Sequence, residues 1–199
     1  MTMTASSIAS SSAVEHPRLA PLRGTGGLWV RLFAMLFRRQ LGKVMTPVWV
    51  IYARMPHLLW PQVLMLRLAQ RGLSLDPTLL DLVQIRVSMV NGCAFCTDLH
   101  RAVAMRSARE EKKLAALDDL AHGDALTAKE RVALLFVDEV TRNGVAGDST
   151  FAALRAAFDE RQIVEQVWLA TITGYLNQMA KALGIGSDGF CELTASKTA

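Results

Sequence analysis

The amino-acid sequence predicts an all-α fold. About half of its 199 residues are hydrophobic (51%), alanine and leucine are abundant, and only 6 prolines and 2 tyrosines occur. Alanine and leucine lose little side-chain freedom in a helix, which favours helix over sheet. Residues that typically begin and end helices also recur along the chain. We therefore expect a helical domain with little or no sheet and a sizeable core.

The N-terminal residues have a different composition from the rest of the chain. Residues 1–27 are rich in serine, proline and glycine and lack apolar periodicity, which is typical of a flexible extension. We expect the folded domain to occupy residues 28–199. It begins at residues 28–42 with an amphipathic helical pattern that would pack on the domain or a partner subunit, or touch a membrane surface. One side of this helix would carry Leu28, Leu32, Met35 and Leu36.

Two prolines divide the apolar stretch that follows Pro47. Pro56 and Pro61 predict turns or helix starts, because proline lacks the N–H that a helix interior uses but fits the first turn. Residues 62–72 then show apolar side chains at helical spacing. We expect this helix to end at Gly72.

The next helix has a marked start and a marked end. Asp76 is a suitable N-cap and Pro77 suits the first helical position, so a helix is expected over residues 77–90. Asn91-Gly92 combines the two residue types that best tolerate the left-handed conformation of a helix C-terminus. Cys93 would then open a new helix.

Three polar pairs mark later helix starts, near residues 108, 128 and 160. They are Ser107 with Glu110, Thr127 with Glu130 and, in looser form, Asp159 with Gln162. Breaks are expected at Gly123, from Asn143-Gly144 to Gly147, and around Gly184. The last long helix, about 160–183, is apolar nearly all round, which predicts burial in the core or at a subunit interface.

The formal net charge of +4 is unevenly distributed. Residues 1–60 carry seven lysines or arginines and one glutamate, whereas residues 61–199 carry fifteen basic and seventeen acidic side chains. Because no basic stripe is interleaved with aromatic residues, we expect no nucleic-acid binding. The basic segment is interpreted as a solvated arm.

The N-terminal sequence shows neither a secretory signal nor a membrane span. Its first fifteen residues have no positive region ahead of an apolar run, and the apolar residues 28–37 form a short stretch that Arg31 interrupts. Three cysteines in a chain of this length also do not form the framework of a small disulfide-stapled secreted protein. We expect a cytoplasmic protein without stable membrane insertion.

Two of the three cysteines lie three residues apart, and a histidine follows the second. Cys96 and His100 fall on one face of the expected helix, about one turn apart. A thiolate is the reactive form of cysteine, and both a nearby imidazole and a Cys-x-x-Cys setting at a helix N-terminus lower the thiol pKa. With Cys93 as the second thiol, the pattern indicates thiol redox chemistry.

Other interpretations of the cysteines remain open. Both cysteines could be buried structural residues, or they could bind zinc together with His100. A structural zinc site needs a fourth ligand, and no second ligand pair is recognisable among Cys191, His16, His57 and His122. Cys191 stands apart from the pair in the sequence and is interpreted as a bystander.

The segment from Asp81 to His100 resembles the core motif of the AhpD-like alkylhydroperoxidases, within the carboxymuconolactone decarboxylase superfamily. That motif combines an acid twelve residues before the first cysteine, a Cys-x-x-Cys pair and a histidine four residues after the second cysteine. The resemblance extends roughly over residues 41–185 and includes Leu176-Asn177-Gln178. It implies an all-α, AhpD-like helical domain that is oligomeric, as a homo-trimer or homo-hexamer.

The resemblance also implies a peroxidase cycle. Cys96 would attack the peroxide and become a sulfenic acid, Cys93 would resolve it, and His100 would act as base or relay. The acid position falls on Asp81, where the family usually has glutamate, and the best-studied members have a second histidine where this chain has Phe95. Asp81 could also be a solvent-facing residue near a helix start, which the helix dipole favours.

The function expected from these residues is that of a thiol-dependent hydroperoxide reductase. Its substrate would be a hydroperoxide, its reductant an external dithiol or lipoyl-bearing protein, and it would need no bound cofactor or metal. One alternative is a carboxymuconolactone decarboxylase-like lyase, in which His100 would act as an acid–base group without thiols. Another is a redox-sensing or binding oligomer without turnover.

Overall fold

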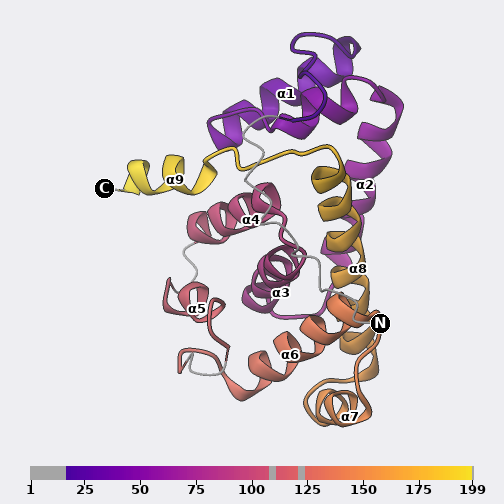
Figure 1. Cartoon of the computed structure of the whole chain (residues 1–199), viewed down its shortest axis with the longest axis vertical. Helices are drawn as coiled ribbons and strands as arrows, with labels where there is room; N and C mark the ends of the chain where they lie inside the picture. Colours follow the sequence, from indigo (N-terminus) through magenta and orange to yellow (C-terminus); the bar gives the residue numbers. More distant parts are fainter. Residues whose placement is uncertain (1–16, 108–110, 121–123, 199) are drawn as a thin grey trace, which may run out of the picture.

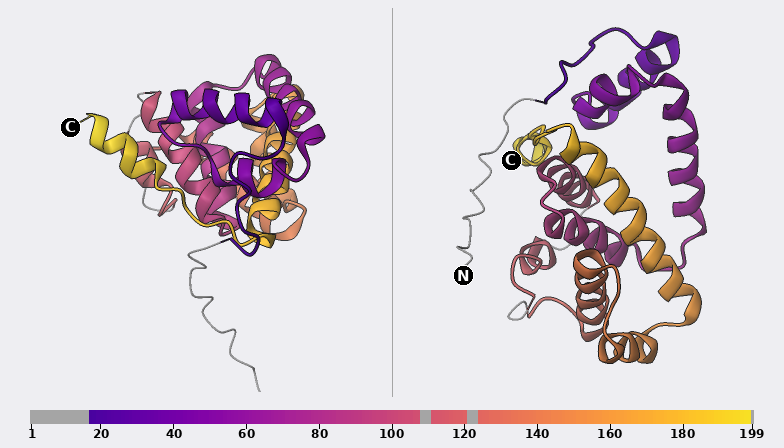
Figure 2. Two further views of the ribbon diagram at one scale, coloured as in Figure 1. Left: turned by 90° about the horizontal axis from the view of Figure 1, so that it is seen from above. Right: turned by 45° about the vertical axis from the view of Figure 1, so that its right-hand side comes forward.

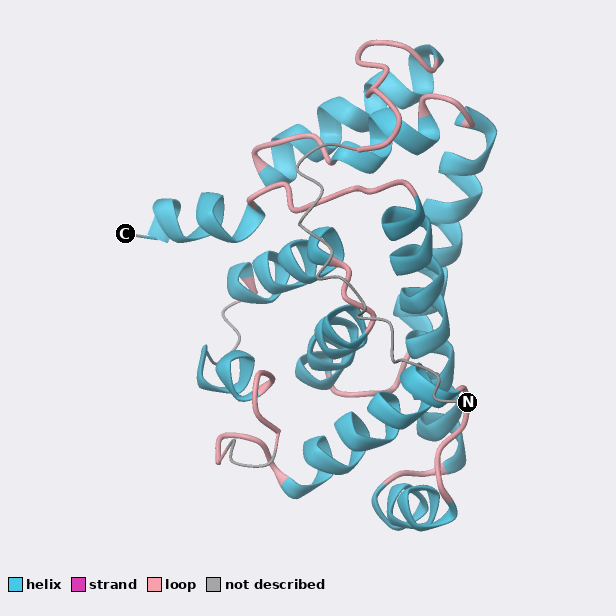
Figure 3. Cartoon of the chain, in the orientation of Figure 1, coloured by secondary structure: helices cyan, strands magenta, loops and turns pink. Residues whose placement is uncertain are grey.

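Every regular element that the structure describes is helical, as predicted (Figure 3). The structure is a computed structural model, and it describes residues 17–107, 111–120 and 124–198. In chain order the elements are α1 (Gly27–Leu41), the π-helical turn η1 (Val48–Tyr52), α2 (Pro56–Gly72), α3 (Pro77–Val90), α4 (Ala94–Arg106), α5 (Glu111–Ala116), α6 (Ala128–Asn143), α7 (Asp148–Ala157), α8 (Glu160–Ala182) and α9 (Phe190–Thr198).

The helices are arranged around α3. Helices α4, α6 and α8 all pack against it, α7 packs against α6, and α9 packs against α4 (Figure 1). Helices α1 and α2 and the turn η1 pack on one another; α1 lies at one end of the molecule, and α2 runs from that end along its side (Figure 2). Because α3 and α4 are joined by a short corner at the centre of this arrangement, the expected Cys-x-x-Cys segment lies in the interior of the domain.

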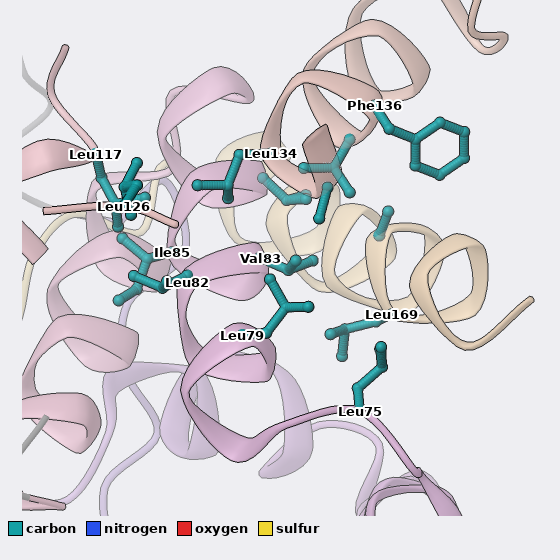
Figure 4. Close-up of a cluster of buried hydrophobic side chains, with 14 of the residues drawn as sticks. Leu75, Leu79, Leu82, Val83, Ile85, Leu117, Leu126, Leu134, Phe136 and Leu169 are labelled. Atoms are coloured by element: carbon teal, nitrogen blue, oxygen red, sulfur yellow. The ribbon is translucent and has the colours of Figure 1, made fainter. Parts of the chain in front are cut away.

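The main hydrophobic core lies between α3, α6 and α8. Leu82 and Val83 of α3, Leu134 of α6 and Leu169 of α8 belong to one cluster and are at most 1% exposed (Figure 4). Full burial of one such side chain contributes about 1.5–3 kcal/mol to folding. This cluster fixes α3, and therefore the start of the corner that leads to Cys93.

Most helix starts follow the signals in the sequence. The Asp76 carboxylate accepts hydrogen bonds from the backbone N–H groups of Thr78 and Leu79, at 2.8 and 3.3 Å. Asp159 accepts a hydrogen bond from the Gln162 N–H at 2.8 Å. Thr127 and Glu130 form the complete capping box at the start of α6. The expected pair Ser107 with Glu110 and the break at Gly123 involve residues outside the described ranges.

The interpretation of Pro61 as a turn or helix start is wrong, whereas Pro56 does begin a helix. Pro61 lies inside α2, in its second turn. Proline removes one backbone hydrogen bond there, but its fixed φ is close to that of a helix. The single apolar stretch therefore forms one helix that ends at Gly72, as expected.

Helix α1 forms as predicted but packs through a different face. Its buried side chains are Val30, Phe33, Ala34 and Leu41. The residues predicted to share its apolar side are exposed, with Leu28 at 77% and Met35 at 61%. The helix carries apolar residues on adjacent faces, so periodicity alone could not select the face that packs.

Residues 17–26 run along the domain before α1. The Arg18 N–H donates to the Leu183 carbonyl at 2.8 Å, and the Leu22 N–H donates to the Trp49 carbonyl at 3.0 Å. The remaining part of the expected extension, residues 1–16, lies outside the described residues. Among the helices of the described ranges, none has the length and apolar character needed to cross a membrane.

Candidate active site

The corner between α3 and α4 positions the first cysteine of the pair. Gly92 has φ +64°, and the backbone N–H groups of Gly92 and Cys93 donate to the carbonyls of Met89 and Ser88, both at 2.9 Å. This is the Schellman arrangement in which a left-handed residue ends a helix. The predicted break at Asn91-Gly92 is confirmed, and it turns the chain so that Cys93 begins α4.

Cys93 and Cys96 are paired as a disulfide at the N-terminus of α4. Their Cα atoms lie 5.3 Å apart, and Cys93 is the N-cap residue whose sulfur accepts a hydrogen bond from the Cys96 N–H at 3.3 Å. Unpaired N–H groups and the helix dipole favour a negative sulfur at this position. The local sequence therefore produces a site in which reduction of the disulfide generates a stabilised thiolate.

An apolar cluster surrounds the disulfide. Cys93 and Cys96 are 1% and 4% exposed, and both pack in one cluster with residues of α1, η1, α4, α8 and the C-terminal segment. The other buried members are Leu41, Val50, Ile51, Phe95, Ala102, Ala180, Ile185 and Phe190. Phe95, between the two cysteines, is thus part of the apolar wall and supplies no second imidazole.

His100 lies one turn after Cys96 on α4. Burial lowers the pKa of its imidazole to about 4, so the ring is neutral near pH 7. Within the described residues, no hydrogen bond to the ring is found. A neutral imidazole at this position accepts or donates a hydrogen bond, and it does not act as a standing positive charge beside the dithiol.

Asp81 is the fifth residue of α3 and is partly buried. Among the hydrogen bonds and ion pairs found between residues 17–107, 111–120 and 124–198, none links Asp81 with His100. The role of Asp81 as the acid of a proton relay therefore stays a prediction. Arg86, on the same helix, has a structural role, since it donates two hydrogen bonds to Asp138 at 2.6 and 2.5 Å and one to the Leu117 carbonyl.

A buried polar network supports the corner from α8. Asn177, 1% exposed, donates to the Ser88 hydroxyl at 3.2 Å and accepts a hydrogen bond from the Asn91 amide at 2.9 Å. Lys181 donates to the Asn91 carbonyl. The network joins α8 to the last turn and the C-cap of α3, which gives the Leu176-Asn177-Gln178 stretch a definite structural role.

Sequence reasoning missed Asp98, which ties α9 to the dithiol helix. Its carboxylate accepts hydrogen bonds from the Ser187 hydroxyl and from the backbone N–H groups of Phe190 and Cys191, at 2.8–2.9 Å. These hydrogen bonds hold the pKa of Asp98 below its ordinary value although burial opposes this. The position of Asp98 between Cys96 and His100 was the available signal in the sequence. Its hydrogen-bond partners, however, lie about ninety residues further along the chain.

Cys191 is placed beside the dithiol helix by the same contact. Its sulfur donates to the Asp98 carbonyl oxygen at 3.3 Å, and burial together with Asp98 raises the pKa of the thiol to about 11. Cys191 and Cys93 line one pocket of about 440 Å³. Separation in the sequence therefore concealed a spatial proximity between the third cysteine and the pair.

No group of three or more histidine, cysteine, aspartate or glutamate side chains suited to hold a metal ion occurs in the part of the chain that the structure describes. Of the residues considered above for a second pair of zinc ligands, His16 and His122 lie outside that part.

Comparison with known proteins gives the same family as the motif. Residues 61–139 match the carboxymuconolactone decarboxylase family. The uncharacterized protein YdfG of Bacillus subtilis is 29% identical over 113 residues, which cover 56% of this chain and 77% of that protein.

Solved structures share the fold. A protein of unknown function from Agrobacterium tumefaciens, described as a candidate antioxidant defence protein AhpD, is 26% identical with a TM-score of 0.64, covering 69% of this chain and 96% of that chain. The debrominase Bmp8 shares the fold with a TM-score of 0.76 at 17% identity, covering 90% and 96% of the two chains. The match over residues 61–139 and the shared fold support assignment of the chain to the AhpD-like and carboxymuconolactone decarboxylase superfamily.

Proposed function

We propose that this protein is a thiol-dependent hydroperoxide reductase. The observation that carries the proposal is the Cys93–Cys96 pair at the start of α4, with His100 one turn beyond Cys96. Its relative from Agrobacterium tumefaciens, described as a candidate antioxidant defence protein, supports the same class of chemistry.

The oxidative half-reaction needs a thiolate, a proton for the leaving group and a second thiol. The Cys96 thiolate attacks one peroxide oxygen, the O–O bond breaks, and the alkoxide or hydroxide leaves with the electron pair and takes up a proton. Cys96 is then a sulfenic acid, which Cys93 converts to the disulfide with release of water. The short Cα–Cα distance of 5.3 Å supports this second step without movement of α4.

His100 is suited to the proton transfer as a relay. Because burial lowers its pKa to about 4, the neutral ring can take the Cys96 thiol proton only while passing another proton from its second nitrogen. An external dithiol would return the disulfide to the reduced state. The apolar walls around the cysteines suit organic hydroperoxides.

The decisive experiment measures peroxide consumption with different dithiol donors and follows the protein by intact mass. The reduced protein should lose two hydrogens after one equivalent of peroxide, with the disulfide mapped to Cys93 and Cys96. Cys93→Ser should accumulate a sulfenic acid on Cys96 that dimedone traps, and Cys96→Ser should not. Free thiols after peroxide treatment, without turnover, would reject the proposal.

The family match also includes decarboxylases, so lyase activity is the second candidate. The double variant Cys93→Ser, Cys96→Ser separates the two, because a lyase that relies on His100 keeps its turnover without thiols. Loss of all peroxide turnover in this variant, with an unchanged fold by circular dichroism, is the result expected for a peroxidase.

A further inference from the structure

Only one residue of the pair lines the pocket beside the disulfide. It measures about 440 Å³, its lining is mainly apolar, and Cys93 contributes to it while Cys96 does not. Cys191 of α9 contributes to the same lining. A molecule that enters this pocket therefore meets Cys93.

The pocket and the His100 side of α4 are different faces of one helix. Ala94, Thr97, Asp98 and Arg101 line the pocket, and their spacing of three, one and three residues forms a single helical stripe. Cys96 and His100, four residues apart, form the neighbouring stripe. The disulfide joins these two stripes, with Cys93 on the pocket side and Cys96 on the His100 side.

We propose that this pocket is the binding site of the reducing thiol and that the reductant attacks Cys93. The inference rests on the proposed function for its place in a cycle, and it adds where the reductant binds and which sulfur it meets. The peroxide then reacts with Cys96 on one face of α4, and the reductant attacks Cys93 from another face.

The exchange step is balanced by a dithiol reductant. Its first thiolate forms a bond to the Cys93 sulfur while the Cys93–Cys96 bond breaks, and the electron pair leaves with Cys96, which takes a proton from water. The second thiol of the reductant then loses its proton and attacks the reductant sulfur that is bonded to Cys93. A disulfide forms in the reductant, and Cys93 leaves as a thiolate that the Cys96 N–H stabilises.

The lining indicates a narrow and uncharged thiol. Cys93 is 1% exposed, so a thiol on a slender arm can reach it and a flat protein surface cannot. The charged groups of the lining already have partners, since Arg101 donates to Asp118 at 2.8 Å and Asp98 accepts three hydrogen bonds from Ser187 and the start of α9. Cys191 does not compete for exchange, because its raised pKa of about 11 keeps it protonated.

Trapping of a mixed disulfide tests which sulfur exchanges. In a Cys191→Ser background, Cys96→Ser leaves only the Cys93 thiol and Cys93→Ser leaves only the Cys96 thiol. The probe is bis(2-hydroxyethyl) disulfide, and the two rates are compared at a pH at which each thiol is fully deprotonated. Under these conditions Cys93 should react about tenfold faster than Cys96, or more. An equal or faster reaction of Cys96 would overturn the proposal. This assay uses no peroxide, so it gives a result even when peroxide turnover is absent.

Filling the pocket tests where the reductant binds. Thr97→Phe should slow reduction of the disulfide by dithiothreitol about tenfold, while the peroxide-driven formation of the disulfide changes by less than about twofold. Thr171→Phe makes the same substitution at an exposed position of α8 and should change neither rate. If Thr97→Phe folds poorly, Ala94→Leu fills the same stripe. Slowing of both half-reactions equally, or of neither in a folded variant, would contradict the proposed site.

Discussion

The backbone N–H of Cys96 points at the sulfur of Cys93, 3.3 Å away, so the first cysteine of the pair caps the helix that carries the second. A hydroxyl or carboxylate usually occupies an N-cap position. Here a sulfur takes that place, and its charge state is coupled to the helix N-terminus.

The first prediction concerns the Cys93 thiol in the reduced protein. Because its thiolate accepts a hydrogen bond from the Cys96 N–H and lies at the positive end of α4, its pKa should fall below that of an ordinary cysteine. The pH dependence of iodoacetamide alkylation in the variant Cys96→Ser, Cys191→Ser measures this pKa. The same variant in urea provides the reference, and equal values in the two states would show that the N-cap has no effect.

The second prediction concerns His100 and stability. Its folded pKa of about 4 lies below the unfolded value of 6.5, so the unfolded state binds more protons between these two values and stability falls as the pH is lowered through this window. The loss amounts to about 3 kcal/mol by pH 4 relative to pH 7. Urea unfolding at several pH values measures it, and His100→Gln should flatten this part of the pH dependence. A wild-type slope that survives the substitution would assign the effect to other groups.

The third prediction concerns Asp98 and Cys191. Asp98→Asn removes the charge that raises the pKa of the Cys191 thiol and weakens the acceptors for the N–H groups of Phe190 and Cys191. Alkylation of Cys191 near neutral pH should therefore become several-fold faster. Peptide mapping of the alkylated site measures this. Asp118→Asn, which changes an exposed carboxylate near Arg101, is the matched control and should leave the rate unchanged.

The fourth prediction concerns the network that holds the corner. Asn177→Leu leaves the Asn91 amide and Ser88 hydroxyl without their partner and should lower the free energy of unfolding by about 1–3 kcal/mol. Gln178→Leu also replaces an amide side chain by leucine, at the adjacent exposed position, and should stay within about 0.5 kcal/mol of the wild type. Equal effects of the two substitutions in chemical denaturation would argue against the network.

The fifth prediction concerns Asp81. If its carboxylate serves the proton relay through His100, Asp81→Asn should reduce kcat/KM for hydroperoxide about tenfold or more, and Asp81→Glu should retain activity. Reduction of the disulfide by dithiothreitol serves as the internal control, since it does not use the relay. Full activity of the Asn variant would leave Asp81 with a structural role only.

The sequence predicted the parts of the site that depend on local geometry. The N-caps at Asp76 and Asp159, the break at Asn91-Gly92 and the opening of α4 at Cys93 all follow from short-range steric and hydrogen-bonding preferences. The Cys-x-x-Cys pairing and the one-turn separation of Cys96 and His100 also depend only on helix geometry.

The parts that were missed depend on tertiary contacts. Asp98 carried no local signal for its partners, because Phe190 and Cys191 are brought to it by the return of the chain after α8. The packing face of α1 was also not predictable, since Leu28 and Val30 are both apolar and only the fold decides which is buried. Pro61 illustrates a third case, in which packing of a long helix tolerates one missing hydrogen bond.

Because α3 ends in a Schellman corner at Gly92, the site depends on the number of residues between α3 and α4 as much as on their types. Deleting or inserting one residue after Asn91 would shift the sequence along α4 by one position and so turn each side chain by about 100° around the axis of α4. Cys93 would leave the pocket wall, and Asp98 would no longer face the N-terminus of α9. Changes in loop length should therefore be tolerated in other connections between helices long before they are tolerated in this one.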